Sequence, residues 1–181
     1  MKIYRPLASL SLLAAFIVSA LAENTNLVLN GSGPRTKPII GTLYDLSLHV
    51  PEALKGSESK TLIESDQPME FRLEIKSRLI TRERFVETTT GGFEKAAKSG
   101  YPSPDSQKFL DQFANTEFKK GDTVIMRYGA DGLTTRYRKA DNTESTLSTI
   151  PGIALKKSLF AIWLGNTPAQ DSLKKALLSP K

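Results

Sequence analysis

Leu43-Tyr44-Asp45-Leu46-Ser47-Leu48-His49-Val50 is the part of residues 39–50 that decides the fold. Apolar and polar residues alternate along it, so that Tyr44, Leu46, Leu48 and Val50 face one way and Asp45, Ser47 and His49 the other. Residues 69–75 repeat the alternation, with Met69, Phe71, Leu73 and Ile75 on the apolar side. This pattern is typical of half-buried strands in an antiparallel sheet that has one covered face.

The remaining residues predict an α+β domain. Further strands are expected over 26–29, 123–128, 133–138 and 143–149, and residues 52–60 are expected to form a surface loop. Helices are expected over 81–99 with Thr81 as N-cap, from Ser103 through Phe113, over 152–164, and over 167–178 after a capping box from Thr167 to Gln170. Strands, two helices, strands and two helices in this order predict an antiparallel sheet with helices on one face.

Composition excludes several classes of protein. The 181 residues contain no cysteine and one histidine, which excludes disulfide scaffolds, thiolate metal sites and cysteine nucleophiles. The formal charge is +6, but the basic residues are scattered among acidic ones, so nucleic acid is not an expected partner. No metal, nucleotide or flavin cofactor is predicted.

The first 22 residues have the pattern of a secretory signal peptide. Lys2 and Arg5 precede an apolar run over 7–18, and Ala20-Leu21-Ala22 supplies a cleavage site. We expect cleavage after Ala22, a single domain over 23–181, and a periplasmic or secreted product; an uncleaved N-terminal anchor is the competing interpretation. Cleavage removes two basic residues and leaves 23 basic and 19 acidic ones, a net charge of +4.

Two short motifs fit a structural role better than a catalytic or a nucleotide-binding one. Asp45, Ser47 and His49 share one strand face, where adjacent side chains lie about 6.6 Å apart along the strand, too far for a nucleophile–base contact. Asn30-Gly31-Ser32-Gly33 contains a G-x-G, but Thr36 stands where a dinucleotide-binding motif needs a third glycine. We interpret the first as the polar face of a strand and the second as a glycine turn.

Four segments together resemble the chalcone isomerase family. These are Asn30-Gly31-Ser32-Gly33-Pro34-Arg35, the strand from Leu43 to Pro51, Phe118-Lys119-Lys120-Gly121-Asp122-Thr123-Val124-Ile125-Met126, and Ala161-Ile162-Trp163-Leu164-Gly165-Asn166-Thr167-Pro168-Ala169. Their order is similar to that of the bacterial secreted chalcone isomerase-like proteins over about residues 26–178. The resemblance implies an open-faced β-sandwich, in which a large antiparallel sheet is covered on one face by helices, with a cleft between the two layers.

The resemblance also implies which positions face that cleft. The turn arginine of the plant enzymes is kept as Arg35, while the strand threonine falls near Tyr44 and the helix tyrosine matches Phe85. The helix asparagine falls near Gly92, and the late-helix hydroxyl matches Ile162. Phenylalanine, glycine and isoleucine offer no side-chain hydrogen bond, and one missing donor typically costs about 3 kcal/mol of transition-state stabilisation. Efficient chalcone cyclisation is therefore not expected.

An arginine at the mouth of an apolar cleft suits an amphipathic anion such as a fatty acid or a phenolic acid. We therefore predict a non-catalytic binding protein, with Arg35, Tyr44, Phe85 and Ile162 as ligand-binding residues. Two alternatives stay open: an isomerase of the intramolecular-lyase type that acts on another substrate, with Arg35 and Tyr44 as its polar groups, and a structural protein of an envelope complex.

Overall fold

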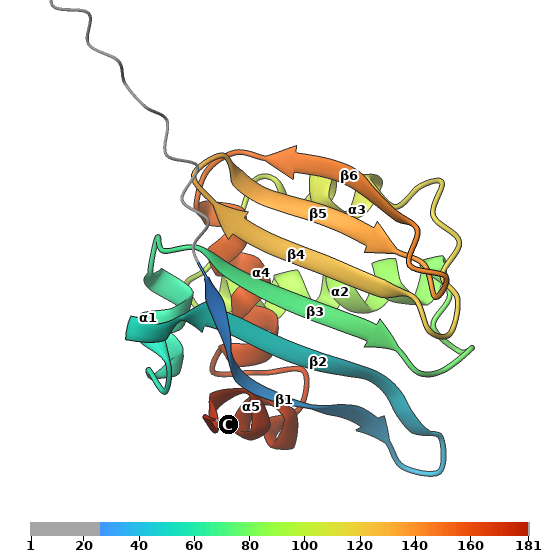
Figure 1. Ribbon diagram of the computed structural model, residues 1–181, viewed down its shortest axis with the longest axis horizontal. Helices are drawn as coiled ribbons and strands as arrows, with labels where there is room; N and C mark the ends of the chain where they lie inside the picture. The colour runs from blue at the N-terminus through green and yellow to red at the C-terminus, as the bar shows by residue number, and fades with distance from the viewer. Residues whose placement is uncertain (1–25, 181) are drawn as a thin grey trace, which may run out of the picture.

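The computed structural model describes residues 26–180 and contains one six-stranded sheet (Figure 1). Each strand pairs antiparallel with the next along the chain, which confirms the predicted antiparallel sheet. The strands are β1 (Leu27–Lys37), β2 (Gly41–Pro51), β3 (Met69–Ile75), β4 (Thr123–Gly129), β5 (Gly132–Arg138) and β6 (Glu144–Ile150). The predicted signal peptide, residues 1–22, lies outside the described residues.

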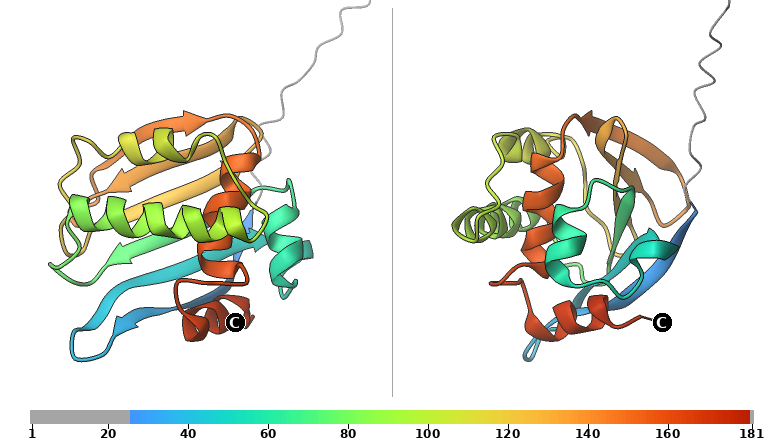
Figure 2. Two further views of the ribbon diagram at one scale, coloured as in Figure 1. Left: turned by 180° about the vertical axis from the view of Figure 1, so that it is seen from behind. Right: turned by 90° about the vertical axis from the view of Figure 1, so that its left-hand side faces the viewer.

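The helices lie on one face of the sheet and leave the other face uncovered, as the edge-on view in Figure 2 shows. They are α1 (Ser59–Glu64), α2 (Arg82–Lys98), α3 (Ser106–Asp111), α4 (Ala154–Leu164) and α5 (Asp171–Leu178), with a short 3-10 helix over Glu52–Leu54. Helix α4 is the most buried of them and packs against α1, α2 and α5. This confirms the predicted α+β class and the open-faced arrangement of one sheet and one helical layer.

The predicted alternation places the core on the helix side of the sheet. Leu46, Leu48 and Val50 of β2 are fully buried, and Phe71 of β3 contacts the rings of Phe160 and Trp163 from α4. Burying one such side chain contributes roughly 1.5–3 kcal/mol, so this interface supplies much of the stability of the fold. The polar residues of β2 and β3 face the uncovered side, as expected.

The uncovered face of the sheet contains a buried acidic residue. Glu70 of β3 has no exposed surface, because the guanidinium groups of Arg72, Arg136 and Arg127 surround it at 2.5, 3.3 and 3.7 Å. A buried carboxylate needs such partners to offset the loss of its water. Three of the basic side chains on this face therefore neutralise one buried carboxylate.

The strand predicted over 26–29 is part of β1, but the glycine turn predicted after it is wrong. Residues 30–35 do not form a glycine turn but continue β1, with a bulge between Leu29 and Gly31. Helix α5 lies directly against this strand: a Cβ atom on Gly31 would collide with the carbonyl oxygens of Ala176 and Leu177. Glycine is needed here for close approach of a helix to a strand, not for a turn.

Three further boundaries differ from the predictions. The segment 52–60 is not only a loop, because the 3-10 helix and the start of α1 lie in it. Helix α3 begins at Ser106, since the Ser103 hydroxyl accepts a hydrogen bond from the Asp105 amide and holds the preceding residues in a turn. The second strand begins at Gly41, and Ile39 lies in the β1–β2 turn with a positive φ of 68°.

Candidate functional site

Arg35 lies near the end of β1 on the helix side of the sheet, directly opposite Tyr44 of β2. Its Nη1 atom donates to the backbone oxygen of Thr36 at 2.7 Å and to the Oε1 atom of Gln170 at 2.8 Å. Gln170 precedes α5 and also accepts from the Thr36 amide. The predicted capping box over 167–170 is therefore wrong: α5 begins at Asp171, and the Gln170 side chain binds Arg35 and Thr36 of β1.

Tyr44 joins Arg35 to α4. Its hydroxyl oxygen accepts a hydrogen bond from the indole nitrogen of Trp163 at 2.9 Å. Burial raises the pKa of Tyr44, although the Trp163 bond and the charge of Arg35 act in the opposite direction. The tyrosine is thus a protonated phenol that can donate a hydrogen bond to an anion. We refer to Arg35, Tyr44, Trp163 and Gln170 as the Arg35 cluster.

The other two predicted site residues lie in different surroundings. The Phe85 ring is buried at the start of α2 and stacks on Phe118 with centroids 4.8 Å apart, with Phe113 beside it at 5.0 Å. Ile162 precedes Trp163 on α4 and meets α2 at Gly92, where a Cβ atom would lie 3.0 Å from its Cγ2 atom. Arg35 and Tyr44 are together, while Phe85 belongs to a separate aromatic cluster.

Gly92 and Ile162 bring α2 and α4 into direct contact within the helical layer. Glycine in the middle of a helix destabilises it by roughly 0.5–1 kcal/mol, yet α2 continues through Gly91 and Gly92 without a break. The Thr81 side chain caps this helix as predicted, by accepting from the Arg84 amide. Close helix packing, more than helix propensity, explains the glycine at position 92.

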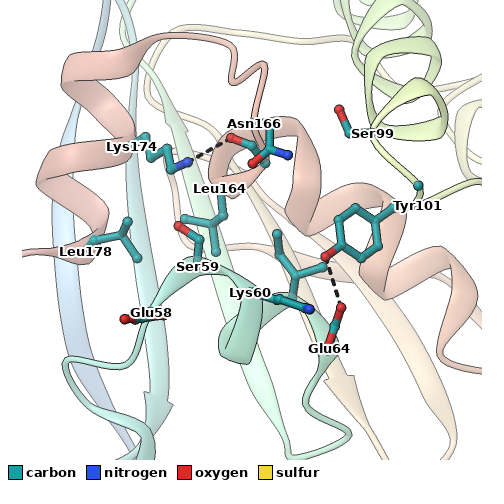
Figure 3. A pocket seen from close by; sticks show the side chains of 13 residues that line it. Glu58, Ser59, Lys60, Glu64, Ser99, Tyr101, Leu164, Asn166, Lys174 and Leu178 are labelled. Carbon is teal, nitrogen blue, oxygen red and sulfur yellow. Dashed lines mark hydrogen bonds between the residues drawn. The ribbon is translucent and has the colours of Figure 1, made fainter.

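A cavity that the sequence analysis missed lies between α1 and α5 (Figure 3). Its volume is about 710 Å³, within the range of small-molecule sites. Residues of α1, the α2–α3 connection, the end of α4 and α5 line it. Lys174, one helical turn after Gln170, donates to the Gly165 oxygen at its edge, and Tyr101 donates to Glu64 across it. The residues come from four separate segments, so no local motif reveals them.

A smaller cavity of about 270 Å³ lies between α2 and α3, lined by Val86 and Leu110 together with charged side chains. Neither of the two cavities is lined by Arg35, Tyr44, Phe85 or Ile162. The Arg35 cluster therefore lies at the edge of the packed core and outside both cavities.

A second basic residue is withdrawn from water in the first turn of α4, at the other end of this helix from Trp163. Lys156 is fully buried, and its Nζ atom donates to the carbonyl oxygens of Leu62, Ile63 and Ser65 at 2.6, 2.9 and 2.7 Å. Burial lowers the pKa of Lys156 to about 7. These three oxygens lie at the end of α1, where a helix leaves carbonyls without partners, so Lys156 completes that helix.

Within residues 26–180, no group of acidic or histidine side chains could hold a metal ion. No helix in the same part of the chain is long and apolar enough to cross a membrane. The chemistry available at the Arg35 cluster is hydrogen bonding and charge from one guanidinium, one phenol and one indole.

Comparison with known proteins places this geometry in a family. No curated protein matches the chain. Among solved structures, a fatty-acid binding protein of Arabidopsis thaliana matches with a TM-score of 0.62 and 16% sequence identity, over 84% of this chain and 86% of that one. The model of the family described as chalcone isomerase-like matches residues 15–179. The sheet, its helical layer and this match show that the chain belongs to the chalcone isomerase-like family.

Proposed function

We propose that the protein binds a small amphipathic anion, a fatty acid or a phenolic acid, through the Arg35 cluster between the sheet and the helices. In this proposal the Arg35 guanidinium pairs with the carboxylate and Tyr44 donates a second hydrogen bond to it. The apolar part of the ligand lies toward Trp163 and the adjoining core. The binding is non-catalytic.

The incomplete bonding of Arg35 carries the proposal. The side chain is half-buried, and both of its acceptors, the Thr36 carbonyl and the Gln170 amide, are neutral. In the described part of the chain, no ion pair includes Arg35. A guanidinium withdrawn from water is best satisfied by a carboxylate that takes two of its donors at once. Its Nε and Nη2 atoms, which donate to no described residue, are suited to such a ligand.

Membership of the family supports the same class of ligand. The Arabidopsis thaliana structure with this fold is a fatty-acid binding protein. Because the two chains share only 16% identity, the likeness concerns the fold, and the choice of ligand for this chain depends on Arg35 and its neighbours. In this proposal α2 and α4, which are in close contact at Gly92 and Ile162, separate when a long apolar chain enters.

The test compares Arg35→Ala with the wild-type protein by calorimetric titration of oleate and of methyl oleate. We expect the affinity for oleate to fall about 5- to 150-fold, which corresponds to 1–3 kcal/mol. The affinity for methyl oleate, which has no charge, is expected to stay the same. Equal affinity of both proteins for oleate would contradict the proposal. Titration with p-coumarate then distinguishes a phenolic acid from a fatty acid.

Two further variants locate the anion. Gln170→Glu places a carboxylate beside Arg35, so we expect it to compete with oleate and weaken binding about as much as Arg35→Ala does. Lys174→Ala removes a cation from the 710 Å³ cavity and is expected to leave oleate binding unchanged. A loss with Lys174→Ala but not with Arg35→Ala would place the anion in the cavity and overturn the Arg35 assignment.

Chalcone cyclisation is expected to be negligible. Phe85, Gly92 and Ile162 stand at the positions where the resemblance implies donors, and none of them carries a hydrogen-bonding side chain. The wild-type protein is incubated with 2′-hydroxychalcone while the visible absorbance is followed. A rate far above the spontaneous one would favour the isomerase alternative.

The proposed location is the periplasm or the extracellular medium, after cleavage behind Ala22. The support is the order of basic residues, apolar run and small residues over 1–22. N-terminal sequencing of the exported protein is expected to begin at Glu23. A sequence that begins at Met1 would instead indicate the anchored form.

A further inference from the structure

The turn between β1 and β2 presents an unusual pair of apolar residues. Residues 36–42, here called the hairpin tip, form the free end of the β1–β2 hairpin at one corner of the sheet (Figures 1 and 2). Ile39 has a relative exposure of 108% and Ile40 of 49%. The third exposed large hydrophobic residue of the described chain, Leu79, has 43% and lies in the β3–α2 loop. All three therefore lie in two neighbouring loops at the same end of the sheet.

The backbone at Ile39 is also strained. The Ile40 amide donates to the Pro38 carbonyl at 2.7 Å and closes a three-residue turn around Ile39, whose φ is 68°. A positive φ is a genuine outlier for a β-branched residue, whereas glycine or asparagine adopts it readily. Isoleucine at this position costs stability and buries no surface within the fold. A function outside the folded chain accounts for it better than packing does.

Charge around the tip indicates what this function is. The two loops, residues 36–42 and 76–81, contain Lys37, Lys76 and Arg78 and no acidic residue. Lys76 forms ion pairs with the neighbouring Glu74 and Asp45, so Lys37 and Arg78 supply the charge. Lys37 and Arg78 are exposed, and the backbone amides of Lys76 and Ser77 donate to the Leu43 carbonyl, which ties the β3–α2 loop to the hairpin. Apolar side chains at a projecting tip with cations beside them are the features that bind the interface of an anionic lipid bilayer.

We propose that the hairpin tip docks the protein on an anionic bilayer surface. Ile39 and Ile40 insert among the acyl chains just below the headgroups, Leu79 lies at the interface, and Lys37 and Arg78 contact lipid phosphates. The inference goes beyond anion binding and does not depend on it, so Arg35→Ala is expected to bind vesicles as the wild-type protein does.

The test measures cosedimentation with vesicles of equal parts phosphatidylglycerol and phosphatidylcholine. Wild-type protein is expected to bind them, and the double variant Ile39→Asn with Ile40→Ser to bind about tenfold or more weakly, because two inserted side chains are lost. Asparagine tolerates the positive φ, so the melting temperature of this variant is expected to stay the same or rise. Binding that does not change in the variant, or no binding by the wild type, would overturn the proposal.

A charge pair and a label complete the experiment. Lys37→Ala with Arg78→Ala is expected to weaken binding by roughly 25-fold, about fivefold for each charge, while Lys55→Ala with Lys175→Ala has a much smaller effect.

The chain has no cysteine, so a fluorophore can be attached at the single cysteine of Ile39→Cys. We expect its fluorescence to rise when vesicles are added, and Thr143→Cys is the exposed control. If the tip variant only converts a dimer to a monomer, the surface joins two copies and the membrane proposal fails.

Discussion

Lys156 and Arg35 are two basic residues near opposite ends of α4, the first fully buried and the second half-buried, and they differ in how fully they are bonded. In its protonated form Lys156 has three hydrogens on Nζ, and three carbonyl oxygens at the end of α1 accept them. The Arg35 guanidinium has five N–H donors, and only its Nη1 atom is bonded, to Thr36 and Gln170.

The difference separates a cation that completes the fold from one that can still bind a ligand. An ammonium with every hydrogen bonded has nothing left to offer, and it holds α1 against α4. A half-buried guanidinium with free donors is costly to the fold until an anion reaches it. Full bonding of Lys156 therefore indicates a structural role, and partial bonding of Arg35 supports the proposed binding role.

The largest expected effect tests the structural side of this comparison. Lys156→Met keeps an unbranched side chain of nearly the same length but leaves the carbonyls of Leu62, Ile63 and Ser65 without their donor. We expect the free energy of unfolding to fall by about 3 kcal/mol in urea denaturation. Lys157→Met, on the next residue of α4, is the matched control and should change little. A loss no greater than that of the control would show that α1 does not need Lys156.

The next effect concerns how α5 brings Gln170 to Arg35. Gly31→Ala adds a Cβ atom that collides with the backbone of α5, so the helix must move away from β1. We expect a loss of about 2 kcal/mol in the free energy of unfolding and weaker oleate binding. Gly91→Ala meets nothing within 4 Å and improves helix propensity, so it should preserve or raise stability. Equal stability of the two variants would contradict the close packing of α5.

Local sequence patterns could be predicted from the sequence, and contacts between distant segments could not. Alternation in β2 and β3, the Thr81 cap and the apolar period of α4 are local patterns, and each predicted its element correctly. Gly31 and Gly33 were misinterpreted because a glycine needed for a helix 140 residues later looks like a glycine needed for a turn. Gln170 was misinterpreted for the same reason, since its partner Arg35 is distant in the sequence.

The same distinction between local patterns and distant contacts applies to the candidate site. The β1–β2 register pairs Arg35 with Tyr44, and their role in ligand binding stays a prediction. The bond from Trp163 to Tyr44 and the cavity beside α5 depend on how the helices pack, which no spacing reveals. The carbonyl shell of Lys156 was missed because a lone lysine in an apolar helix carries no signal of its partners.

A smaller effect is the pH dependence of stability. Burial lowers the pKa of Lys156 to about 7, while an unfolded lysine titrates near 10.5. Between these values the unfolded chain holds a proton that the folded chain has released, so the free energy of unfolding rises with pH. We expect an increase of about 1–2 kcal/mol from pH 7.5 to pH 9 in urea denaturation. Lys156→Met should lack this increase, and a wild-type stability that stays flat would contradict it.

The smallest expected effect is the change in the free energy of unfolding when Arg35 is replaced. Arg35→Met removes hydrogen bonds to Thr36 and Gln170, but both acceptors lie in half-buried residues that water can reach once the guanidinium is gone. We expect the free energy of unfolding to fall by less than about 1 kcal/mol, well below the loss from Lys156→Met. Adding oleate should then stabilise the wild-type protein in proportion to the logarithm of its concentration and stabilise Arg35→Met far less, because binding to the folded state alone shifts the unfolding equilibrium. A loss of stability for Arg35→Met that approached the Lys156 value, with oleate stabilising both proteins equally, would place Arg35 with Lys156 as a structural cation.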